Sequence, residues 1–67
     1  MEVADRLAQL VPHWIEHNES HAQQLIEWAA QARGAGLGEV ADSIEAAAEQ
    51  LVQANGSLAL ARDRLQP

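Results

Sequence analysis

The chain contains no cysteine, phenylalanine, tyrosine or lysine, and these absences restrict the kinds of protein that it can be. Without cysteine, neither a disulfide nor a thiolate metal site holds the 67 residues together. A single domain of this size is marginally stable, so close helix packing, a metal ion or oligomerisation has to stabilise it. No long apolar run or charged leader is present, so we expect no membrane span, no signal peptide and a cytoplasmic protein.

Basic residues are scarce, because four arginines stand against ten acidic residues and the net charge is −6. Nucleic acids and anionic membranes bind basic surfaces, so we expect neither of them as a partner. Aromatic and β-branched residues are few and alanine is abundant, which favours helix. We therefore predict an all-α protein with one domain over residues 1–67.

Apolar residues at helical spacing divide the chain into four segments. We predict a short helical segment at 1–11, a long helix at 12–35, a turn at 36–38 and a second long helix at 39–65. Pro12 sets the first boundary, because proline lacks the N–H that a helix interior needs. A single kinked helix across Pro12 is the alternative. Gly36 followed by Leu37 is typical of a glycine that ends a helix.

A short turn between two long helices predicts an antiparallel hairpin, in which facing residue numbers sum to about 73. Asn18 then lies opposite Asn55. The helical period predicts that the inner stripe of the first long helix consists of Trp14, Asn18, His21, Leu25 and Trp28. Across the hairpin, the same period predicts packing by Ile44, Leu51 and Leu58.

The predicted stripe contains a polar layer of Asn18, His21 and Asn55. A buried asparagine in a helical seam fixes register and partner number at a cost in stability. The apolar surface continues beyond the stripe through Ile15, Ala22, Ile26 and Ala29. Either the N-terminal segment folds back over this surface or two copies pair into a helical bundle, and we favour a homodimer. A different helical protein, bound in the manner of an adaptor or antitoxin-like subunit, is a further alternative.

Histidines recur every four residues at His13, His17 and His21. Two imidazoles one helical turn apart are a chelating arrangement for nickel, zinc or cobalt. A transition-metal-binding accessory protein that uses His17 and His21, with His13 as a third candidate, is therefore the alternative to an interaction module. We expect no enzyme, because the chain lacks a cysteine nucleophile, a serine with histidine and carboxylate partners, and a phosphate-binding loop.

The run from Trp14 to His21, with Trp28, Ala35-Gly36-Leu37 and Asn55, resembles a group of small acidic helical domains of archaea and bacteria. The resemblance covers the chain from Pro12 onward and rests on the pattern W-I-x-H-N-E-x-H. It implies a helical hairpin, no established biochemical function, and a special role for His17, Asn18, His21 and Asn55. The chain departs from the group at Gly34 and Gly38, where charged helix formers are expected.

Overall fold

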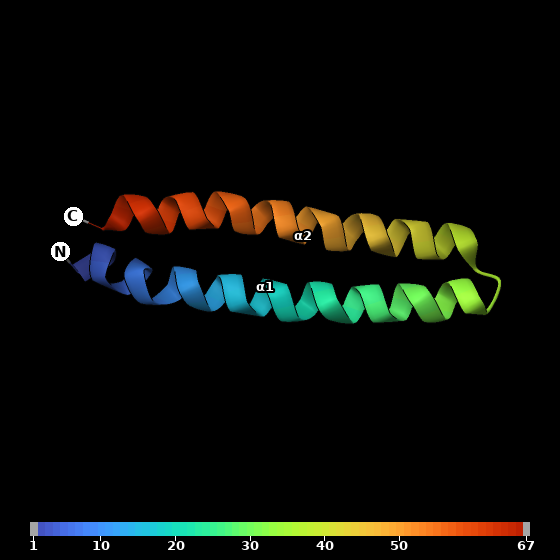
Figure 1. The fold of residues 1–67 in the computed structure, drawn as a ribbon. Coiled ribbons are helices and arrows are strands. Elements are labelled where there is room, and N and C mark those ends of the chain that lie inside the picture. The colour runs from blue at the N-terminus through green and yellow to red at the C-terminus, as the bar shows by residue number, and fades with distance from the viewer. Residues whose placement is uncertain (1, 67) are drawn as a thin grey trace.

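The computed structural model describes residues 2–66 as two helices joined by a tight turn. Helix α1 spans Glu2–Gly34 and helix α2 spans Gly38–Leu65. The helices lie side by side in opposite directions, with both ends of the chain at one end of the molecule and the turn at the other (Figure 1). The predicted all-α antiparallel hairpin is confirmed.

The hairpin is a rod that measures 52 × 14 × 12 Å. Its radius of gyration is 15.4 Å, whereas a compact domain of this length has about 11 Å. Each helix therefore contacts only one neighbour. A helix with one neighbour buries only a narrow stripe of its surface, and the remaining apolar side chains stay in contact with solvent.

Helix α1 continues through Pro12, so the predicted boundary between residues 11 and 12 is wrong. Proline removes one helical hydrogen bond, the one that would reach the carbonyl of Ala8. Ala8 is exposed, so water can satisfy that carbonyl. Val11, directly before the proline, is only 2% exposed. Packing of Val11 at the interface with α2 holds the helix together across the proline. Met1 and Pro67, the outermost residues of the predicted domain, lie outside the described residues.

The turn occupies residues 35–37, slightly earlier than predicted. Gly36 has a φ of 84°, a left-handed conformation that glycine adopts without steric cost. Its N–H donates to the carbonyl of Arg33 at 3.1 Å, and the N–H of Leu37 donates to the carbonyl of Ala32 at 2.9 Å. These two bonds satisfy the last carbonyls of α1 in the Schellman arrangement. The sequence Gly36-Leu37 thus sets the point at which the chain reverses.

The core consists of small residues. The buried side chains are those of Val11, Ala22, Ala29, Ala41 and Ala48. In the register of the hairpin, Ala22 lies opposite Leu51 and Ala48 lies opposite Leu25, so a small residue faces a larger one. This alternation allows two helices to approach closely without a void. Because alanine buries little apolar area, the core of one hairpin contributes little stabilisation.

We predict that Gly36→Ala lowers the free energy of unfolding by about 1 kcal/mol, because a Cβ atom is strained at positive φ. Thermal and urea unfolding, followed by circular dichroism at a fixed protein concentration, measure this loss. Gly34→Ala is the matched control. Gly34 is helical, and an added Cβ meets no atom within 4 Å, so this variant should be as stable as the wild type or slightly more stable. Equal losses in both variants would contradict the role of the turn.

Candidate functional site

A pair of asparagines links the two helices near the middle of the rod. The side-chain amide of Asn18 donates to Oδ1 of Asn55 at 3.0 Å, and the amide of Asn55 donates to the backbone carbonyl of Ile15 at 3.1 Å. Both asparagines are half-buried. The two residues meet in the register that the position of the turn predicts. Since carbonyl oxygens have two lone pairs, that of Ile15 accepts this bond in addition to its helical one.

The inner stripe of α1 differs from the prediction by one residue at three of its five positions. Ile15, Ala22 and Ala29 face α2, whereas the predicted Trp14 and Trp28 are 40% and 63% exposed. The prediction that these tryptophans form the core is therefore wrong. An indole ring is too large for the space between two helices whose contact is made by alanines. Asn18 and Leu25 belong to both stripes and lie inward, as do Ile44, Leu51 and Leu58 on α2.

His21 is exposed and takes no part in the contact between the asparagines. The predicted layer of Asn18, His21 and Asn55 therefore reduces to the two asparagines, and it is half-buried rather than buried. The second hydrogen-bond partner in this layer is the carbonyl of Ile15 rather than the imidazole of His21. The apolar surface predicted beyond the stripe, at Ile15, Ala22, Ile26 and Ala29, also differs from the prediction. Ala22 and Ala29 lie in the core, whereas Ile26 is 49% exposed.

One side of the hairpin, here called the open face, carries no aspartate, glutamate, lysine or arginine. Helical spacing places two stripes on this side, next to the contact between the helices. On α1 the open face comprises Leu7, Leu10, Trp14, His17, His21, Leu25 and Trp28. On α2 it comprises Val40, Ala47, Leu51, Ala54, Leu58, Ala61 and Leu65.

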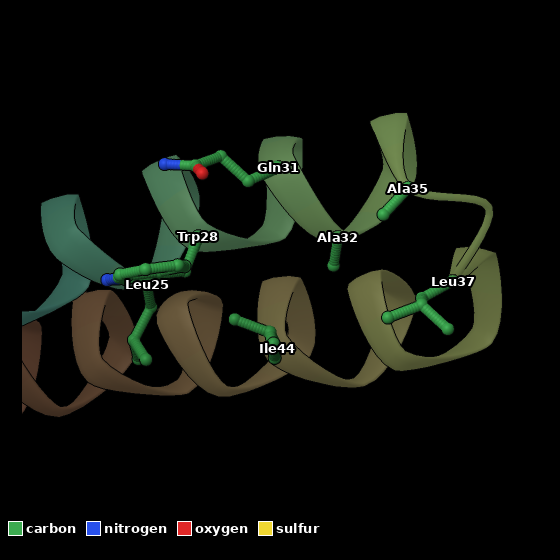
Figure 2. Close-up of a pocket in the computed structure, with 7 residues that line it drawn as sticks. All are labelled: Leu25, Trp28, Gln31, Ala32, Ala35, Leu37 and Ile44. Atoms are coloured by element: carbon green, nitrogen blue, oxygen red, sulfur yellow. The ribbon is translucent and has the colours of Figure 1, made fainter.

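An apolar groove of about 650 Å³ lies on the open face at the end near the turn. Figure 2 shows Trp28 from α1 beside Leu25, with Ile44 and Leu37 contributed from the other side of the groove. Ala32 and Ala35 form its floor toward the turn, and Gln31 is its one polar lining residue. The groove is open and shallow, so it suits an apolar side chain of another molecule better than an enclosed small ligand.

Charge is concentrated on the opposite side of the hairpin. The guanidinium group of Arg33 contacts Asp42 at 2.9 Å and Glu45 at 3.0 Å, and it links the helices close to the turn. Hydrogen bonds to these two carboxylates raise the pKa of Arg33 above its ordinary value, because they favour the charged form. All three side chains are exposed, and such ion pairs contribute little to stability. They mark the charged side of the rod.

Two of the three histidines, His17 and His21, belong to the open face of α1. The ring centroids of His17 and His21 are 6.1 Å apart, with the ring planes tilted by 32°. His13 is exposed and lies one turn before His17. Within residues 2–66, no three side chains of histidine, aspartate or glutamate lie close enough together to hold a metal ion. The protein itself thus offers two imidazoles at this position, and no third ligand.

Comparison with known proteins identifies a family. Within residues 2–66, neither helix is both long enough and apolar enough to cross a membrane. No curated protein and no solved structure matches the chain. Residues 7–65 match the profile of a domain of unknown function, DUF8180, and this match spans the turn, both asparagines and all three histidines. The chain therefore belongs to the DUF8180 family.

Proposed function

We propose that the protein is a non-catalytic assembly module, in which two copies of the hairpin pack through their open faces into a four-helix bundle. The observation that carries this proposal is the open face itself, an uncharged side of the rod with two exposed tryptophans. Continuous apolar surfaces of this extent on soluble proteins mark sites of association. The small core of a single hairpin contributes little stability, and association would bury additional apolar area.

The open face has a second seven-residue repeat on each helix. On α1, Trp14, His21 and Trp28 are spaced by seven residues. On α2, the repeat consists of Val40, Ala47, Ala54 and Ala61. A helix with one apolar seven-residue repeat packs against one neighbour, and a helix with two adjacent repeats packs against two. The second repeat on both helices is therefore what a four-helix bundle requires.

A second copy of the chain fits this face because the two repeats are complementary in size. The repeat of α1 carries tryptophans, whereas that of α2 carries mainly alanines. If α1 of one copy lies beside α2 of the other, large side chains meet small ones at both contacts. This arrangement follows from a two-fold axis along the rod. It also keeps the acidic outer surfaces of the two copies, each of net charge −6, away from the interface.

The contact between Asn18 and Asn55 serves this assembly by fixing the register of each hairpin. A shift of either helix would place an amide against a leucine and break these hydrogen bonds, each of which contributes about 0.5–1.5 kcal/mol. The bundle then has one alignment of its apolar repeats.

The alternative role of an enzyme gains no support from the groove, whose lining has no nucleophile and no carboxylate.

We predict that the wild-type chain is a dimer at micromolar concentration and that Trp28→Glu makes it monomeric. Burial of the new carboxylate in the interface would weaken association at least tenfold, because a charge without a partner is costly to desolvate. Analytical ultracentrifugation measures the mass, and circular dichroism checks that the helices remain folded.

Val52→Glu is the matched control for Trp28→Glu. Val52 is 61% exposed and lies on the charged side of α2, outside the open face. This variant should stay a dimer. A monomeric wild type would contradict the proposal and leave the open face for a different protein. Dissociation of both variants to the same degree would also contradict it.

We also predict that the double variant Asn18→Leu, Asn55→Leu has a higher melting temperature and forms several oligomeric states. Leucine adds buried apolar area, and the loss of the amide contact removes the penalty on alternative registers. Thermal unfolding and native mass spectrometry measure these two properties. Gln23→Leu, at an exposed position of α1, controls for the addition of leucine. A single dimeric species in the double variant would show that the asparagines do not select the register.

A further inference from the structure

The pair of His17 and His21 lies on the open face, but packing of apolar side chains does not account for two imidazoles on successive turns of α1. Both residues are exposed, and their ring centroids lie 6.1 Å apart on successive turns of α1. Within residues 2–66, neither ring makes a hydrogen bond or an ion pair with another side chain. Their nitrogen atoms are therefore free to bind a ligand from solution.

We propose that His17 and His21 chelate one divalent transition-metal ion of the nickel, copper or zinc class. An imidazole nitrogen binds such an ion at about 2 Å. Rings with centroids 6.1 Å apart reach a common ion after a small rotation of the side chains. Imidazole suits these metals, whereas magnesium and calcium prefer oxygen ligands. With no third protein ligand within reach in residues 2–66, water completes the coordination shell.

The electrostatic surroundings favour a cation at this position. On α1 itself, the nearest arginines are Arg6 and Arg33, each more than ten residues from the pair. The chain carries a net charge of −6, which raises the local concentration of cations. His17 lies at the outer edge of the open face, while His21 lies within the repeat that contains the tryptophans. His21 would therefore lie in the proposed interface, but both imidazoles belong to one helix, so a single hairpin can form the site.

His13 provides a matched control for this site. It is exposed and lies one turn before His17, so it has the same spacing from His17 as His21 has. Within the described residues, only the rings of His17 and His21 form a close pair. The structure thus assigns the site to one of two pairs that are equivalent in sequence.

The test is isothermal titration of the full, tag-free chain with nickel chloride, with magnesium chloride as the control salt. We expect one nickel ion per chain and no magnesium binding. His17→Ala and His21→Ala should each raise the dissociation constant for nickel at least tenfold, because one imidazole remains. His13→Ala should bind nickel as the wild type does. Circular dichroism without metal should be unchanged in all three variants.

The monomeric variant Trp28→Glu separates this inference from the proposed assembly. It should bind one nickel ion per chain, since both imidazoles belong to one helix. Absence of nickel binding to the wild-type chain would overturn the metal site, whatever the oligomeric state. Equal loss of binding in His13→Ala and His21→Ala would also overturn the assignment, because it would point to a diffuse cluster of histidines.

Discussion

Two helices can bury only the stripes that they turn toward each other, and this constraint determines the rest of the molecule. The stripe between α1 and α2 is filled largely by alanine, with Val11, Ala22, Ala29, Ala41 and Ala48 buried. Alanine permits a close approach of the helices but leaves no space for a large ring. The two tryptophans are therefore placed beside the contact rather than in it. The same geometry that makes the hairpin thin also produces its open face.

The asparagine contact has a different role from the apolar core. Apolar packing between two alanine-rich helices changes little when one helix slides by a turn, because one alanine resembles the next. Hydrogen bonds between amides depend on direction and distance, so the bonds made by Asn55 to Asn18 and Ile15 are lost on sliding. A weakly specifying core thus needs a polar contact to define its alignment. The half-burial of both amides limits the energetic cost of this device.

The sequence was sufficient to predict the hairpin, the position of the turn to within one residue, and the pairing of Asn18 with Asn55. It was insufficient to decide between adjacent residues at three positions of α1, where Trp14 or Ile15, His21 or Ala22, and Trp28 or Ala29 fit a helical stripe equally well. Hydrophobicity favours tryptophan at these positions, whereas close packing favours the smaller side chain. The distance between the helices determines which residue faces inward, and the sequence does not give that distance. The break predicted at Pro12 is absent for a related reason. The local cost of proline is visible in the sequence, but the burial of Val11 that offsets it depends on α2.

The choice between adjacent residues explains how one helix carries both the asparagine contact and the two exposed imidazoles. Had the tryptophans formed the core, His21 would lie between the helices and its ring would be committed to the asparagine layer. Because Ile15, Ala22 and Ala29 face α2 instead, His21 points outward and its ring lies next to that of His17. The asparagine contact that fixes the register thus lies between the helices, whereas the imidazoles of His17 and His21 lie on the open face. Asparagine suits the first position because it does not titrate or bind metals strongly, so alignment of the helices is independent of metal and pH.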